Sequence, residues 1–147
     1  MLKRYTFWLW VAVTLQLITC VVHSLSLFVA PVPGNPTEAQ LLDLMTNYKM
    51  DMGAGIYRSF FDLFRALSSC FSLLCLLGGL TNIYLLKRKV EGGIIKGLVG
   101  IQVLVFGICL AMMSLFTFLP PIILTGLVFL TLTATYFTAP DRASTPS

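Results

Sequence analysis

The chain has 147 residues, of which 57% are hydrophobic and 11% charged, and its mean hydropathy is +0.89. This composition excludes an ordinary soluble domain and predicts an all-α, polytopic membrane protein made of a single domain. The formal net charge is +4, but no basic groove interleaved with aromatic side chains accompanies it, so we expect no nucleic-acid binding.

Four apolar segments are long enough to cross the hydrocarbon layer of a membrane. That layer is about 30 Å thick, and about 20 helical residues cross it. The predicted spans cover residues 5–30, 56–86, 94–119 and 121–138. The sequence therefore predicts a bundle of four transmembrane helices with short connections.

The first span carries a polar face. Gln16, Thr19, Cys20 and His23 follow the spacing i, i+3, i+4, i+7, which places them on one side of a helix. Such a stripe is expected to face another polar stripe within the bundle. For His23 two interpretations remain open: a hydrogen bond across a helix interface, or membership of a pocket. As the only histidine it predicts neither a haem site nor a metal site.

The connection after the first span contains a second kind of helix. Residues 37–52 form an amphipathic pattern, which begins with Thr37 and Gln40 in the spacing of a capping box. The segment is too polar to span a membrane, so we predict an extracytoplasmic helix on the membrane surface. It acts either as a lid over a pocket or as a connector that covers the bundle.

The second predicted span carries three charges. Arg58, Asp62 and Arg65 follow the spacing i, i+4, i+7, so a helix would place them on one face, and Ser69 extends that face. A charge in lipid costs about 2.5–3.5 kcal/mol. We therefore expect this face to point into protein or water, with Asp62 paired to Arg58, to Arg65 or to both.

The depths of the two polar faces predict a ligand site in the outer leaflet. Counted at 1.5 Å per residue from the outer helix ends, His23 and Arg65 lie at similar levels. We predict that His23, Arg58, Asp62 and Arg65 share a pocket, and that deeper side chains complete it: Gln16 and Ser69. Two arginines against one aspartate favour an anionic ligand. The pattern indicates no catalytic residue, no metal site and no cofactor.

The third predicted span carries small residues at helical spacing: Gly100, Gly107, Ala111 and Ser114. A face of small side chains allows another helix to approach closely. Internal packing and a seam with a second copy or a membrane-complex partner both fit this pattern. The fourth span has no charge, and we predict that the tail, residues 140–147, is disordered.

Basic residues predict the orientation of the chain. Lys3 and Arg4 precede the first span, and Lys87, Arg88 and Lys89 separate the second span from the third. By the positive-inside rule both termini are predicted to be cytoplasmic. The same basic run is also compatible with a contact to anionic lipid or a partner, but a topology signal explains it sufficiently.

One resemblance extends over nearly the whole chain. Its features are the histidine late in the first span, the acidic amphipathic outer segment, and the sequence GIYRSFFDLFRALSS that opens the second span. With these features the chain resembles an uncharacterised family of small bacterial four-span inner-membrane proteins. The resemblance implies the architecture and a bacterial cytoplasmic membrane, and it implies no activity.

Three classes of function are therefore considered. The first is a membrane protein that binds a lipid-like or anionic ligand in the outer-leaflet pocket. The second is a structural or accessory subunit of a membrane complex, in which the charged residues only hold helices together. The third is a membrane enzyme or an oligomeric transporter. The sequence favours this class less than the first two, because no nucleophile with an adjacent base and no inverted repeat is apparent.

Overall fold

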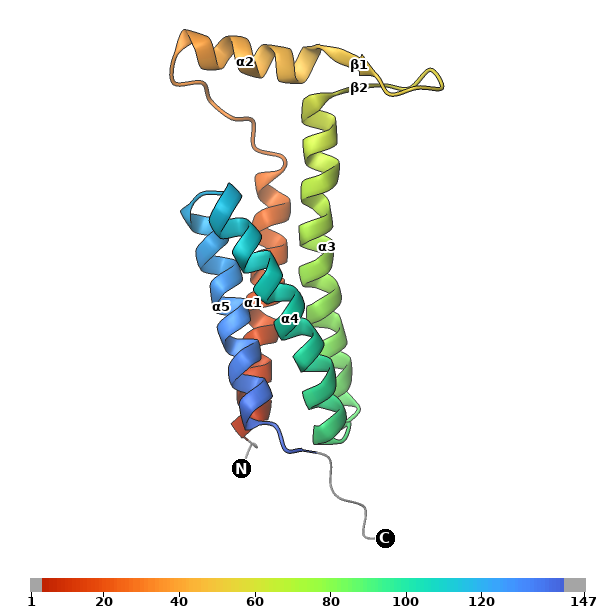
Figure 1. The fold of residues 1–147 in the computed structure, drawn as a ribbon, viewed down its shortest axis with the longest axis vertical. Coiled ribbons are helices and arrows are strands. Elements are labelled where there is room, and N and C mark those ends of the chain that lie inside the picture. Colours follow the sequence, from red (N-terminus) through yellow and green to blue (C-terminus); the bar gives the residue numbers. More distant parts are fainter. Residues whose placement is uncertain (1–3, 142–147) are drawn as a thin grey trace. The chain divides into compact units, whose positions relative to one another are not determined.

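The computed structural model describes residues 4–141, and it divides into two compact units. One unit contains residues 4–19 and 75–141, and the other is Cys20–Leu74. Figure 1 shows the elements in chain order: α1 (Arg4–Ser26), α2 (Pro36–Asn47), β1 (Lys49–Asp51), β2 (Tyr57–Ser59), α3 (Phe60–Lys87), α4 (Gly92–Phe116) and α5 (Leu119–Thr138).

Four of these helices, α1, α3, α4 and α5, are long and apolar enough to cross a membrane. They run for 23, 28, 25 and 20 residues. Many large apolar side chains on them are exposed, among them Leu67, Leu104 and Phe137, as expected for helices that face lipid. The predicted number of apolar helices and their positions along the chain are thus confirmed.

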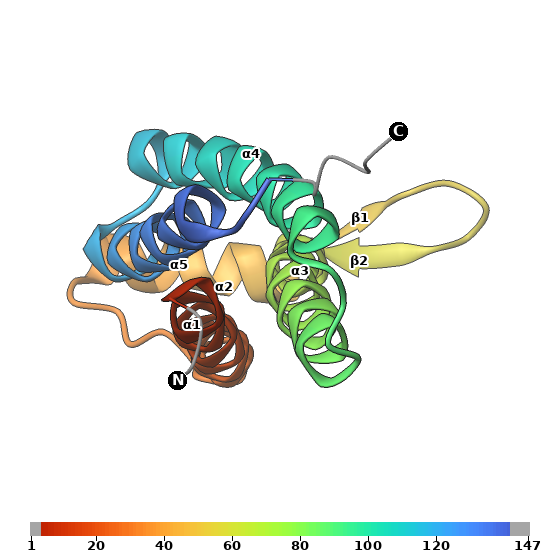
Figure 2. The same cartoon turned by 90° about the horizontal axis from the view of Figure 1, so that it is seen from below.

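Helices α4 and α5 lie side by side in the first unit (Figures 1 and 2). A side chain built at Gly100 would meet the ring of Tyr136 at 3.1 Å, and one built at Gly107 would meet Phe129 at 3.2 Å. These two glycines therefore pack against α5 of the same chain. Ala111 and Ser114 are exposed, and the Ser114 hydroxyl donates to the carbonyl of Leu110 in its own helix.

Asp141, the last described residue, lies at the end of the first unit that holds the basic residues. Lys96 forms an ion pair with Asp141, and its ammonium group lies 5.2 Å from the centre of the Tyr136 ring. Asp141 was expected to belong to a disordered tail. The rest of that tail, residues 142–147, lies outside the described residues.

In the second unit, α2 confirms an amphipathic helix between the first two apolar helices, but it starts one residue earlier and ends five residues earlier than predicted. Its N-cap is Asn35 rather than Thr37. The Asn35 side chain accepts a hydrogen bond from the Glu38 N–H (2.9 Å), and the Glu38 carboxylate accepts from the Gly34 N–H (2.7 Å). Because Pro36 then occupies the first turn, the start of the helix is fixed there.

The segment between α2 and the second span contains a β-hairpin, which the sequence analysis did not predict. β1 pairs with β2 antiparallel, with Lys49 opposite Ser59 and Asp51 opposite Tyr57. Residues 53–55 have positive φ angles of 89°, 52° and 75°, and glycine occupies the first and last of these positions. Glycine adopts this conformation without strain, so the Gly-Ala-Gly sequence closes a turn instead of extending a helix.

α3 consequently begins at Phe60, four residues later than predicted. Its first turn is closed by reciprocal hydrogen bonds, in which the Asp62 N–H donates to Ser59 Oγ and the Ser59 N–H donates to Asp62 Oδ2, both at 3.1 Å. This Ser-x-x-Asp arrangement is a capping box, and it stops the helix from extending back to Arg58. Arg58 therefore lies on β2, not on the helix.

Candidate functional site

The charged residues predicted to form one helical face lie on two different elements. Arg58 is exposed on β2, where its Nη1 donates to the carbonyl of Tyr57 (2.9 Å), whereas Asp62 and Arg65 belong to the first turns of α3. The ion pairs expected for Asp62 do not form, so that prediction was wrong. Within residues 4–141 the only ion pair is that of Lys96 with Asp141. The Asp62 carboxylate instead binds the backbone of Ser59.

Arg65 is held by an aromatic ring rather than by a carboxylate. Its guanidinium carbon Cζ lies 4.5 Å from the centre of the Phe61 ring. Helical side chains lean toward the N-terminus of their helix, so the Arg65 cation reaches back by about one turn toward the hairpin. Phe61 in turn stacks on Phe64, with ring centres 6.4 Å apart. Arg65 is thus placed near the level at which the hairpin enters α3.

His23, on α1, contacts α3 further along that helix. Its Nε2 is 3.1 Å from the carbonyl oxygen of Ser68, and its ring meets the Phe71 ring edge to face. A carbonyl only accepts hydrogen bonds, so the His23 Nε2 is the donor and carries the proton. Ser68 follows Asp62 by six residues, or about 9 Å along the helix. His23 therefore joins α1 to α3 within the second unit, at a different level from the cap formed by Asp62.

The two deeper residues of the predicted pocket are engaged elsewhere. The Ser69 hydroxyl donates to the carbonyl of Ala66 in its own helix at 2.7 Å. Gln16 belongs to the first unit, where it contacts Asn82 and Gln102. The six predicted residues thus occupy different settings: Arg58 lies on the hairpin, Asp62 and Arg65 lie in the first turns of α3, and Ser69 lies further along α3. His23 lies on α1, where it contacts the Ser68 carbonyl, and Gln16 belongs to the amide cluster.

This amide cluster is formed by Gln16 of α1, Asn82 of α3 and Gln102 of α4. The Asn82 amide nitrogen donates to Gln16 Oε1 (3.1 Å) and to Gln102 Oε1 (3.0 Å). The Gln102 amide nitrogen donates back to Asn82 Oδ1 (2.9 Å). The Gln16 amide nitrogen donates to Gln102 Oε1 (3.1 Å). Gln16 and Asn82 are fully buried. The cluster joins three of the apolar helices by hydrogen bonds in a largely buried setting, where an unpaired amide would be costly.

Sequence reasoning identified only one of these three amides. Gln16 was singled out because it lies on the polar face of the first span, but its partner was expected to be the second span's charged stripe. The signal for the other two was their rarity: Asn82 is the single carboxamide of α3, and Gln102 is the single carboxamide of α4. Isolated amides in membrane helices generally bond to each other across helix interfaces.

A comparison with family models, curated proteins and solved structures found no match to this chain. The resemblance to small bacterial four-span proteins therefore stays a prediction. Within the described residues no group of three or more His, Cys, Asp or Glu side chains is arranged to hold a metal ion.

The capping box at the start of α3 leads to a first prediction. Ser59→Ala removes the hydroxyl that accepts from the Asp62 N–H, and it should lower the free energy of unfolding by about 1 kcal/mol. Asp62→Asn should leave the melting temperature nearly unchanged, because the amide oxygen still accepts from the Ser59 N–H. Thermal unfolding in detergent measures both. A large loss of stability for Asp62→Asn would instead indicate that its negative charge is buried against an arginine.

Proposed function

We propose that this chain is an integral membrane protein that binds an anionic amphiphile at the start of α3, with the ligand's phosphate or carboxylate group held by Arg58 and Arg65. One observation supports this most directly. The Asp62 carboxylate, the nearest acidic group in the sequence, is bound to the Ser59 backbone. Neither arginine forms an ion pair with an acidic side chain among residues 4–141, although the charge of Arg58 acts on the Asp62 carboxylate from a distance, so both guanidinium groups can bind a ligand directly.

The chemistry of the two arginines suits a phosphate or carboxylate group. A guanidinium carries five N–H donors in a planar fork and binds such groups through two parallel hydrogen bonds. The Tyr57 carbonyl occupies one Arg58 donor, and stacking of Arg65 on Phe61 leaves the N–H groups at the edge of its guanidinium free. Lys49 on the neighbouring strand is also within electrostatic reach of this region.

The surroundings suit the apolar part of an amphiphile. Tyr57, Phe60 and Phe64 are each at least half exposed beside the two arginines. Aromatic side chains of this kind are enriched where a membrane helix meets the headgroup layer. Next to them α2 runs across the direction of the first part of α3 (Figure 1), and exposed Leu41 and Leu44 give it an apolar face. A helix crossing the direction of a membrane span lies along the surface.

The orientation completes the proposal. The basic run of Lys87, Arg88 and Lys89 follows at the opposite end of α3 and favours a cytoplasmic location for that end. The arginine site would then lie in the outer leaflet of a bacterial cytoplasmic membrane, as the sequence predicts. Arg65 reaches back toward the headgroups from about one turn inside the helix, which lowers the cost of placing its charge there.

Native mass spectrometry tests the proposal on protein released from nanodiscs of phosphatidylcholine with a minor fraction of phosphatidylglycerol. Losing one charge-assisted hydrogen bond weakens binding about tenfold. We expect Arg58→Gln and Arg65→Gln each to reduce retained phosphatidylglycerol by about that factor. Arg88→Gln is the matched control, because Arg88 also lies over an aromatic ring, that of Tyr84 at 5.5 Å, but at the other end of α3.

Two results would contradict the arginine site. One is unchanged retention in the double variant Arg58→Gln/Arg65→Gln. The other is an equal loss in Arg88→Gln, which would indicate a general attraction to anionic lipid. The accessory-subunit function would then be favoured, and a separate observation supports it: among residues 4–141 the sheet consists of β1 and β2, so each strand has one edge that pairs with no other strand.

A further inference from the structure

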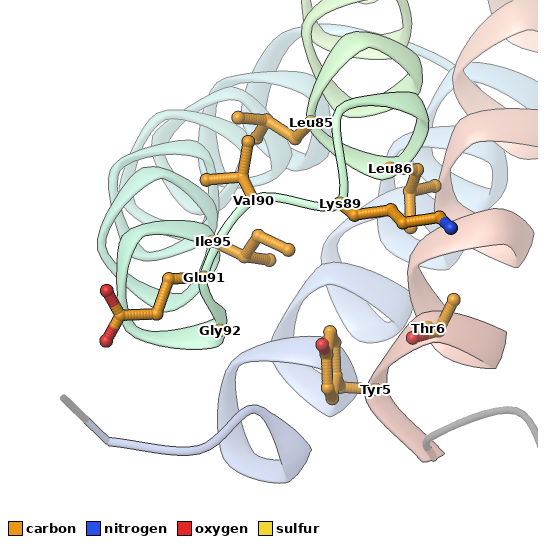
Figure 3. A pocket seen from close by; sticks show the side chains of 9 residues that line it. All are labelled: Tyr5, Thr6, Leu85, Leu86, Lys89, Val90, Glu91, Gly92 and Ile95. Atoms are coloured by element: carbon orange, nitrogen blue, oxygen red, sulfur yellow. The ribbon is translucent and has the colours of Figure 1, made fainter. Parts of the chain in front are cut away.

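A pocket of about 420 Å³ lies at the basic end of the first unit, far in sequence from the arginine site (Figure 3). We use "basic end" for the part of this unit around residues 85–96, where α3 ends and α4 begins. The start of α1 supplies Tyr5 and Thr6, the end of α3 supplies Leu85, and the following loop and α4 supply Lys89, Gly92 and Ile95. This volume is within the usual range for small-molecule sites.

Tyr5 presents a polar atom to this pocket. Its side chain is more than nine-tenths buried, with 8% exposed. Its phenol hydroxyl nevertheless forms no hydrogen bond with any residue from 4 to 141, and the Thr6 hydroxyl beside it forms none either. The phenol oxygen is not among the fully buried polar atoms that lack a partner, so a ligand in the pocket can reach it. Two neighbouring hydroxyl groups at the pocket are thus available to a ligand.

Lys89 supplies a positive charge. It lies in the left-handed region, with φ of 51°, so the loop between α3 and α4 turns sharply at this residue. In Figure 3 its side chain extends toward Thr6, whereas the Glu91 carboxylate is turned away from the pocket. Lys96, the next basic residue along the chain, is already paired with Asp141. The free charge at the pocket is therefore the Lys89 ammonium group.

The backbone adds to the positive potential. α4 begins at Gly92, which lines the pocket, and its N-cap residue Glu91 makes no side-chain hydrogen bond to the first turn. The N–H groups of Ile94 and Ile95 donate to the Glu91 carbonyl, so only those of Gly92 and Gly93 are left in the first turn, and the helix dipole makes this end positive. Together with Lys89 and two hydroxyl donors, this helix start favours a negatively charged group.

The opposite wall is apolar. Leu85 and Ile95 are almost completely buried, and both line the pocket. A free inorganic anion would gain nothing from this surface, whereas a hydrocarbon chain attached to the anion would leave water when it contacts the surface, which favours binding. The donors on one side and the aliphatic side chains on the other thus match a ligand with a charged head and an apolar tail.

We infer that the pocket at the basic end is a second binding site, which takes the phosphate group of an amphiphile between Lys89, the Tyr5 hydroxyl and the first turn of α4, with the start of its hydrocarbon chain against Leu85 and Ile95. The site is separate from the arginine site and shares no residue with it. A membrane lipid and a soluble phosphorylated compound would offer the same phosphate group, so the test has to separate the two sources.

The test uses the full chain with Arg58→Gln and Arg65→Gln, so that the arginine site does not contribute. Native mass spectrometry in detergent follows titration with dihexanoyl-phosphatidic acid, and inorganic phosphate forms the second arm. Tyr5→Phe removes only the hydroxyl and keeps the buried ring, so it should fold normally and bind about tenfold more weakly. Lys89→Gln should weaken binding by at least the same factor.

Lys87→Gln is the matched control. It removes an equal charge two residues from Lys89, on an exposed side chain that does not line the pocket, and it should change the affinity less than twofold. Equal affinity of wild-type and Tyr5→Phe protein would overturn the site. So would a loss in Lys87→Gln as large as that in Lys89→Gln. Inorganic phosphate binding as tightly as the short-chain lipid would overturn the role of the apolar wall.

Discussion

Replacing Asn82 with alanine is expected to lower the free energy of unfolding by roughly 2–4 kcal/mol. Asn82 takes part in three of the four hydrogen bonds of the amide cluster. Hydrogen bonds between membrane helices contribute about 0.6 kcal/mol on average and up to about 1.7 kcal/mol each. The larger part of the loss comes from the carboxamides of Gln16 and Gln102, which would lose partners in a buried setting.

Reversible unfolding in mixed micelles measures this effect, and Thr14→Ala is its control. The Thr14 hydroxyl is exposed and donates to the Trp10 carbonyl within α1, so its loss should cost less than about 0.5 kcal/mol. If Asn82→Ala were no more destabilising than Thr14→Ala, the amide cluster would not hold the three helices together. That result would also mean that Gln16 does not help to hold α1 against α3 and α4.

The cluster should also show coupling. In the double variant Asn82→Ala/Gln102→Leu, the partner that Asn82→Ala leaves unpaired is itself removed. The double variant should therefore cost clearly less than the sum of the two single variants, by about 1 kcal/mol or more. Additive losses would indicate that the two side chains act independently.

The four apolar helices could be predicted from the sequence because their signal is strong and local. A run of about 20 apolar residues has few stable alternatives to a membrane helix, since every backbone group must bond within the segment. The small-residue pattern at Gly100 and Gly107 likewise predicted close packing. It could not distinguish a helix of the same chain from a second copy, and the structure brings Tyr136 and Phe129 of α5 against it.

The hairpin was missed because two local signals disagreed. Apolar residues after Gly55 continue without interruption into the second span, which favoured a helix from residue 56 onward. The opposing signals were short: glycines at 53 and 55, and the Ser59-x-x-Asp62 capping box. Giving those signals more weight would have placed Arg58 outside the helix and removed the expected face of three charges.

The partners of Gln16 were missed for a geometric reason. Counted from the helix ends at the basic end, Gln16 lies 12 residues into α1, whereas Asn82 lies only five residues from the end of α3. These depths differ by about 10 Å at 1.5 Å per residue. Helices that begin at different levels or tilt cannot be aligned by counting residues, so the contact depends on packing that the sequence does not display.

Gly78→Ala is expected to destabilise the protein by about 1–3 kcal/mol, although alanine usually favours a helix over glycine. A Cβ atom at Gly78 would lie 2.5 Å from Gln16 Nε2 and 3.4 Å from Gln102 Oε1. The Gln16 side chain, which is fully buried, would have to move, and its hydrogen bond to Gln102 would break.

Two comparisons separate this clash from a general effect of glycine. Gly97 on α4 has no atom within 4 Å of a Cβ added there, so Gly97→Ala should be neutral or stabilise the protein by up to about 1 kcal/mol. In a Gln16→Ala background the obstructing carboxamide is absent, and Gly78→Ala should then cost almost nothing. A cost that persisted in that background would mean that Gly78 is required by its own backbone and not by the amide cluster. Loss of the cost would show that glycine at residue 78 is what allows α3 to approach Gln16 closely enough for Asn82 to bond with it.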